Sequence, residues 1–211
     1  MDKLYVALIV SLIALFFLIR NFVLFYKYRN GQDTTYKIMT VFLGLDALNE
    51  LACNVYGTLC PGENLIITHS HYQLQFLFCS MVFYSLITTH FRKVIVLITV
   101  LFYAFVIYHC YQDSAILFTI NIREIFIISA ILIIYALYYL YYLIDRKENY
   151  INFTIGLIMY LLCSSIVFFY GVEEIVICEK PFVDIWVFSS IFLIIYQLLI
   201  YRDWKIINKL N

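Results

Sequence analysis

Four polar side chains interrupt the apolar run Lys37–Leu59, which is long enough to span a membrane. Asp46, Glu50 and Asn54 follow one another at every fourth position, and Asn49 lies beside them. In a helix, side chains at this spacing share one face. An ionisable side chain inside a bilayer costs about 2.5–3.5 kcal/mol on insertion scales and marks ion paths, ligand sites or proton relays. We therefore predict that this face points into a helix bundle, where it finds polar partners.

Arg20 and Gln75 are the polar residues that we expect to meet this face from neighbouring runs. Arg20 lies in the inner third of the preceding run, so we predict that its guanidinium pairs with the Asp46 carboxylate. Glu50 then has no cation at its depth and needs hydrogen bonds. Three interpretations of the face stay open: contacts that hold helices together, a ligand or ion site, and a proton relay.

A second polar group gathers at the outer ends of the runs. It consists of His69, His71, His109, Glu124 and Asp184. Imidazole and carboxylate groups suit zinc and similar ions. However, the chain contains neither a His-x-x-Glu-His nor a His-x-x-x-His spacing. We therefore expect these side chains to face water, and we predict no metal, no cofactor and no catalytic residue.

The overall composition requires a membrane. The chain of 211 residues is 64% hydrophobic and 13% charged, whereas soluble domains average about 45–50% and about 25%. A spanning helix needs about 20 mostly apolar residues, and seven runs qualify: Leu4–Tyr26, Lys37–Leu59, His71–Phe91, Lys93–Cys110, Thr119–Ile144, Ile151–Gly171 and Pro181–Tyr201. We predict an all-α protein in which residues 1–211 form a single bundle of seven transmembrane helices, without a soluble domain.

Basic residues are distributed unevenly between the two ends of this predicted bundle. When alternate connections are assigned to opposite sides, three basic residues lie on one side and ten on the other: Lys27, Arg29, Lys37, Arg92, Lys93, Arg146, Lys147, Arg202, Lys205 and Lys209. Cytoplasmic loops carry such an excess. The amino terminus should then lie outside and the carboxyl terminus inside, in a multi-pass protein of the cell inner membrane. The expected partners are the lipid bilayer and a cytoplasmic protein, and the zero net charge argues against direct nucleic-acid binding.

The six cysteines divide between two environments. Cys60, Cys110 and Cys178 fall on the outer side, where a Cys60–Cys178 or a Cys60–Cys110 disulfide is compatible with an oxidising compartment. The other three lie within runs and should pack as small apolar side chains: Cys53, Cys79 and Cys163. No Cys-x-x-Cys spacing occurs, so redox catalysis has no support.

Short motifs mark several places along the chain: the hydrophobic run Phe42–Leu51 with its acidic residues, Asn64 before the Tyr-containing segment His71–Phe76, the pair Arg92-Lys93, and Glu124. Together they resemble small, uncharacterised seven-span bacterial membrane proteins. That group usually has an acidic residue in its third helix, where this chain has Gln75. The size, the topology and the abundance of Ile, Phe, Tyr, Lys and Asn also resemble the membrane accessory proteins encoded beside type VI-B CRISPR RNA-cleaving effectors.

The sequence contains no catalytic triad, metal signature, phosphate loop or soluble catalytic domain, which favours a non-enzymatic accessory or regulatory protein that modulates a partner. The second resemblance implies that this partner is a CRISPR effector in antiviral defence. The basic inner residues are the charged surface that such a cytoplasmic partner would contact; attraction to anionic lipid is the simpler explanation of the same residues. The alternative is a small-molecule or ion transporter, or a ligand sensor. In that case the inner end of the binding site would be formed by Asp46, Glu50 and Asn54. Its outer opening would be formed by the outer histidines and acidic residues.

Overall fold

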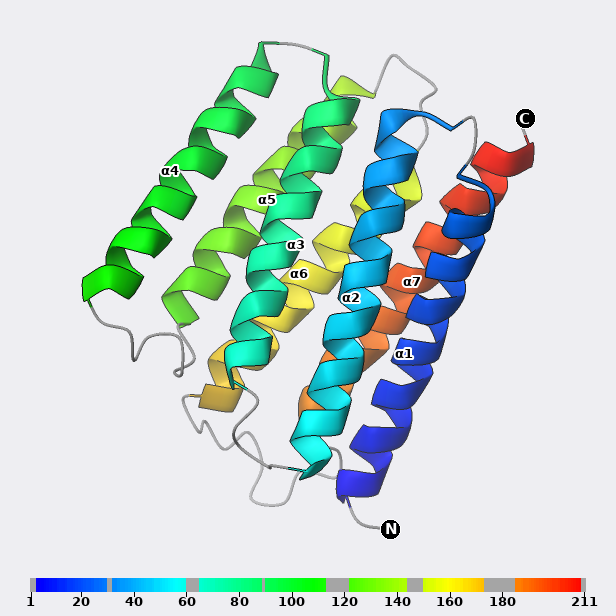
Figure 1. Ribbon diagram of the computed structural model, residues 1–211, viewed down its shortest axis with the longest axis vertical. Coiled ribbons are helices and arrows are strands. Elements are labelled where there is room, and N and C mark those ends of the chain that lie inside the picture. The colour runs from blue at the N-terminus through cyan, green and yellow to red at the C-terminus, as the bar shows by residue number, and fades with distance from the viewer. Residues whose placement is uncertain are drawn as a thin grey trace.

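The computed structural model describes residues 3–29, 32–59, 65–88, 90–112, 122–143, 150–172 and 185–209. These residues form seven α-helices and no strand: α1 (Lys3–Lys27), α2 (Thr34–Leu59), α3 (Leu65–Leu86), α4 (Phe91–Gln112), α5 (Ile122–Tyr142), α6 (Ile151–Val172) and α7 (Ile185–Lys209). The predicted all-α class is confirmed. Consecutive helices run in opposite directions, so the two ends of the chain lie at opposite ends of the bundle (Figure 1).

Six of the helices close into a ring. Neighbours pack in the order α1, α2, α3, α5, α6, α7 and back to α1, while α4 lies outside the ring against α3. The peripheral position of α4 is evident from its side chains, since only Ile95 and Phe102 are buried. Most of its other large apolar residues are exposed, with Ile107 at 68% exposure and Leu97 at 59%.

The bundle is apolar outside and carries polar groups inside. Exposed Leu, Ile, Val, Phe and Tyr side chains cover the outer faces, whereas Asn21, Asp46, Gln75, Glu124 and Gln197 are buried. Lipid explains this arrangement, because it solvates apolar side chains and offers polar ones no partner. Within the described residues, five helices are long and apolar enough to cross a membrane, namely α1, α2, α4, α5 and α7. The chain therefore has the character of a membrane protein.

Helices α3 and α7 differ most from their predicted bounds. Helix α3 begins at Leu65 instead of His71 and ends at Leu86 instead of Phe91. Its polar first turns, which read as a loop, are helical because their side chains find partners on α2, α5 and α6. Helix α7 begins at Ile185 and continues to Lys209, well past Tyr201. Its last turns stay ordered by packing against the start of α6.

A neutral amide pair joins α1 to α7. The Asn21 Nδ2 group donates to the Gln197 backbone oxygen at 2.7 Å and to its side-chain oxygen at 2.9 Å, and both residues are fully buried. Such contacts between membrane helices contribute about 0.6 kcal/mol on average.

Of the cysteines expected within spans, Cys79 is buried and the other two are half-buried, whereas Cys60 and Cys178 lie outside the described residues.

Candidate functional site

Asp46 and His71 form a largely buried pair between α2 and α3. The His71 Nδ1 atom lies 3.1 Å from the Asp46 Oδ1 atom, and the histidine and aspartate side chains are 13% and 5% exposed. On the other side of the imidazole, the Nε2 atom of His71 lies 3.4 Å from the hydroxyl oxygen of Tyr160 on α6. An ionised carboxylate only accepts hydrogen bonds, so the Nδ1 atom of His71 carries a proton. When the imidazole is neutral, its Nε2 atom accepts a hydrogen bond from the Tyr160 hydroxyl. When the imidazole is protonated, Nε2 donates a hydrogen bond to the same hydroxyl oxygen. The ring can exchange a proton and keep both contacts.

Glu50 and Asn54 continue the same face of α2 and meet Ser11 of α1. The Ser11 hydroxyl lies 3.1 Å from Glu50 Oε1 and 2.7 Å from Asn54 Oδ1, and its single proton serves one of them at a time. Asn54 Nδ2 lies 3.3 Å from the same Glu50 oxygen and 2.9 Å from the Glu50 backbone oxygen. The structure thus places Glu50 and Asn54 in contact on one face of α2. Ser11 was not among the predicted site residues, and its one signal was a hydroxyl inside an otherwise apolar run.

The predicted pairing of Arg20 with Asp46 is wrong. The Arg20 guanidinium carbon lies 4.0 Å from the centroid of the Tyr201 ring and 6.0 Å from that of Phe17. This part of α1 turns toward α7, as the neighbouring Asn21 amide also does. A cation–π contact therefore holds the arginine, and His71 takes the place beside Asp46.

His71 does not belong to the outer group, which is a second correction. It lies six residues after the start of α3 and faces α2, where it interacts electrostatically with Glu50 as well as Asp46. Gln75 lies one turn further on the same face of α3 and is buried, and its Oε1 atom has no hydrogen-bond partner among the described residues. Asn49 contacts Cys53 of its own helix, with 3.9 Å between nitrogen and sulfur, and is not part of the cluster.

The outer group assembles only in part. His69 Nδ1 lies 3.6 Å from Glu124 Oε2, and the Gln73 amide donates to the other carboxylate oxygen. His109 is exposed at the end of α4 and packs edge-on against Phe105. Asp184 lies outside the described residues. Within the part of the chain that the structure describes, no three His, Cys, Asp or Glu side chains come together as metal ligands.

The described basic residues of the predicted inner side lie at one end of the bundle. The α1–α2 connection, the α3–α4 connection and the end of α7 all lie at the upper end in Figure 1. Lys27, Lys37 and Lys93 are exposed there. The Arg29 guanidinium lies 3.8 Å from the centroid of the Tyr26 ring. Arg92 binds backbone oxygens at the end of α3, and Arg146 and Lys147 lie outside the described residues.

Asp203 is a buried carboxylate that the sequence analysis did not single out. It reaches from α7 to the first turn of α6, where it accepts from the Phe153 backbone amide at 2.6 Å and from the Asn152 side chain at 2.7 Å. The first amides of a helix lack partners within the helix, and a carboxylate there also suits the helix dipole. Asp203 therefore caps the amino-terminal end of α6, although it belongs to α7.

Removing this carboxylate should loosen the α6–α7 junction. We expect Asp203→Ala to lower the free energy of unfolding by about 2 kcal/mol, because buried amide donors lose their acceptor. Unfolding by SDS in mixed micelles, followed by tryptophan fluorescence, measures the change. The neighbouring Arg202→Ala substitution is the control, because Arg202 is exposed; an equal loss in both variants would contradict this assignment.

The cluster on α1, α2, α3 and α6 combines two carboxylates, an imidazole, a phenol and a hydroxyl. These groups can accept and release protons, or surround a small cation with oxygen and nitrogen donors. No family model, curated protein or solved structure matches this chain.

Proposed function

We propose that this protein is a non-enzymatic, multi-pass membrane transporter or ligand sensor that takes up a proton or a small cation at the Asp46–His71–Glu50 cluster. The observation that carries the proposal is the Asp46–His71 pair, largely buried within an apolar-faced bundle and continued by Glu50. Ionisable side chains at such positions line proton relays and substrate paths in membrane proteins.

A function in binding explains the cluster better than helix packing alone. The bundle joins α1 to α7 with the neutral pair Asn21–Gln197, which carries no charge into the apolar interior. At α1, α2 and α3 it uses two carboxylates and a histidine, a costlier set to bury. The Gln75 oxygen on the same face of α3, which has no hydrogen-bond partner within the described part of the chain, adds an acceptor that a bound cation or water would use.

The proposed topology has seven spans in the cell inner membrane. Over the residues that the structure describes, five helices meet the length and apolarity of a span, and α6 adds a shorter apolar stretch. The first half of α3 is polar because its histidines and Gln73 contribute to the two clusters. The described basic residues of the inner set lie at one end, and this asymmetry supports an amino terminus outside and a carboxyl terminus inside.

Glu50→Gln tests the proposal with the proton as probe. A hydrogen bond to a charged group contributes about 1.5–3 kcal/mol, so we expect a tenfold or greater loss of response. The protein is reconstituted in phosphatidylcholine vesicles that contain a pH-sensitive dye, and a pH step is applied. Proton transport is measured as a change in the fluorescence of the dye inside the vesicles. Sensing is measured as a change in the tryptophan fluorescence of the protein.

The matched control for this experiment is Asn49→Ala on the same helix, because Asn49 contacts Cys53 instead of the cluster. It should respond like the unmodified protein. If Glu50→Gln also responds like the unmodified protein in both signals, while remaining folded, the proposal is contradicted.

A second candidate function is that of an accessory protein for a cytoplasmic partner. The exposed side chains of Lys27, Lys37 and Lys93 at one end of the bundle favour it, because they offer an acidic protein surface a place to bind. Affinity purification from the native host in mild detergent tests it. A stoichiometric partner that Lys27→Gln with Lys37→Gln releases would support this function, and its retention by that variant would contradict it.

A further inference from the structure

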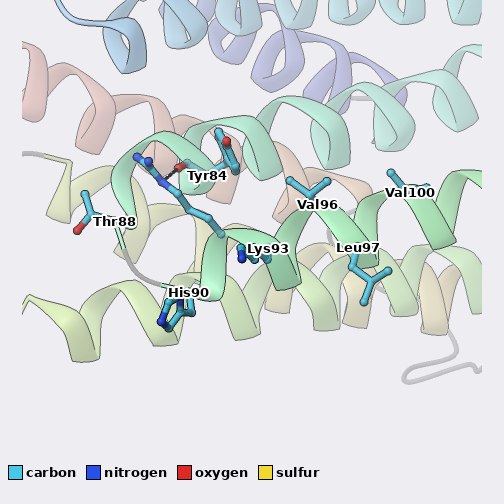
Figure 2. Close-up of a pocket in the computed structure, with 8 residues that line it drawn as sticks. Tyr84, Thr88, His90, Lys93, Val96, Leu97 and Val100 are labelled. Carbon is cyan, nitrogen blue, oxygen red and sulfur yellow. Dashed lines mark hydrogen bonds between the residues drawn. The ribbon is translucent and has the colours of Figure 1, made fainter.

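A groove runs along the outside of the bundle between the end of α3 and the first half of α4. It encloses about 850 Å³ and is lined by Tyr84, Thr88, His90, Arg92, Lys93, Val96, Leu97 and Val100. Figure 2 shows its two parts: His90 and Lys93 lie at one end, and Val96, Leu97 and Val100 follow along α4. The groove lies far from the Asp46 cluster in the chain and shares no residue with it.

The polar end of the groove is positive in three ways. Lys93 and His90 are exposed, and neither is paired with a carboxylate among the described residues. The first turn of α4 contains Arg92 and Lys93 and no acidic residue. Because free amides give a helix start a partial positive charge, basic side chains are unfavourable there without an anion.

Arg92 holds the shape of this end. Its guanidinium donates to the backbone oxygens of Tyr84 at 2.8 Å and Ser85 at 3.2 Å, and also to that of Ile87. These carbonyls lie at the carboxyl-terminal end of α3, where a helix leaves its last oxygens without partners of its own. Arg92 therefore ties the start of α4, which also carries Lys93, to the end of α3.

The apolar end of the groove continues toward the middle of the membrane. Val96, Leu97 and Val100 are 47%, 59% and 60% exposed, and Tyr84 is 44% exposed on the facing helix. Successive turns of α4 carry this surface inward for about 10 Å from Lys93, at 1.5 Å per residue. The groove thus has one end that attracts anions, at the basic end of the bundle, and continues from there as an apolar surface that suits an acyl chain.

We propose that this groove binds one anionic glycerophospholipid. The phosphate lies against Lys93, His90 and the start of α4, and one acyl chain lies along Val96, Leu97 and Val100. A zwitterionic lipid offers the same chain but cancels its phosphate charge with an amine, so it binds less well. The inference is independent of the function proposed for the Asp46 cluster.

Native mass spectrometry of the full-length protein tests this site, with phosphatidylglycerol and phosphatidylcholine of identical acyl chains as probes. We expect one phosphatidylglycerol to be retained in preference to phosphatidylcholine. The substitutions Lys93→Gln with His90→Gln should weaken that retention by about tenfold and leave phosphatidylcholine unchanged. Lys37→Gln with Lys205→Gln is the control, because it removes two exposed basic residues outside the groove.

Several results would overturn the proposal. Equal retention of the two lipids would mean that lipid surrounds the protein without a defined site. Equal phosphatidylglycerol binding by the Lys93→Gln/His90→Gln variant, or an equal loss in the control, would place the attraction elsewhere on the basic end. Displacement by inorganic phosphate at matched concentration would show that the apolar wall contributes nothing.

Discussion

His71→Leu should destabilise the bundle strongly, and Asp46→Leu added to it should restore stability. With histidine removed, the Asp46 carboxylate stays buried without its partner, which costs about 3–5 kcal/mol in comparable buried pairs. With both replaced by leucine, neither member of the pair is left buried without the other, and such exchanges are often neutral or stabilising. SDS unfolding followed by tryptophan fluorescence gives the free energies of the two single variants and the double variant.

The size of the single effect separates two explanations of the pair. An ordinary hydrogen bond between membrane helices contributes about 0.6 kcal/mol. A loss of that size for His71→Leu, with no recovery in the double variant, would mean that Asp46 finds other partners. The Asp46–His71 contact at 3.1 Å would then not be the centre of the site.

Tyr196→Ala should be the second strongly destabilising change. The Tyr196 ring is 1% exposed and stacks on Tyr160 with 5.7 Å between centroids. It also fills the space over Gly156, where a β-carbon would lie 2.9 Å from the ring. Truncating a buried aromatic side chain costs about 3–5 kcal/mol, and the loss of packing should also release Tyr160 from its position beside His71.

Tyr196→Phe is the matched control. The Tyr196 hydroxyl has no hydrogen-bond partner among the described residues, so its removal should be neutral or slightly stabilising. The same SDS titration measures both variants. A large loss for Tyr196→Phe would show that the hydroxyl has a partner that this account overlooks, and a small loss for Tyr196→Ala would mean that the α6–α7 contact repacks easily.

The spacing of polar residues was enough to predict the face of α2. Asp46, Glu50 and Asn54 share one side of any helix, whatever surrounds it, because the period of the helix is fixed. The helices themselves were also predictable, since a long apolar run that must satisfy its own backbone in lipid has little choice but to be helical.

The partners of that face were not predictable, because spacing does not determine which helices are neighbours or how each is rotated. Arg20 has the right depth for Asp46 but faces Tyr201 of α7. His71 resembled an interfacial residue because the polar first turns of α3 read as a loop. Asp203 caps the start of a helix that begins about fifty positions earlier in the chain. No local sequence pattern predicts a capping contact between residues so far apart.

Proton uptake by the folded double variant tests the central claim most directly. The unmodified protein and Asp46→Leu/His71→Leu are compared in phosphatidylcholine vesicles after the same pH step, with protons counted by an external dye and folding checked by SDS titration. We predict that the double variant is as stable as the unmodified protein but takes up fewer protons and loses the dye or fluorescence response. A folded double variant with undiminished uptake and response would contradict the assignment of the site.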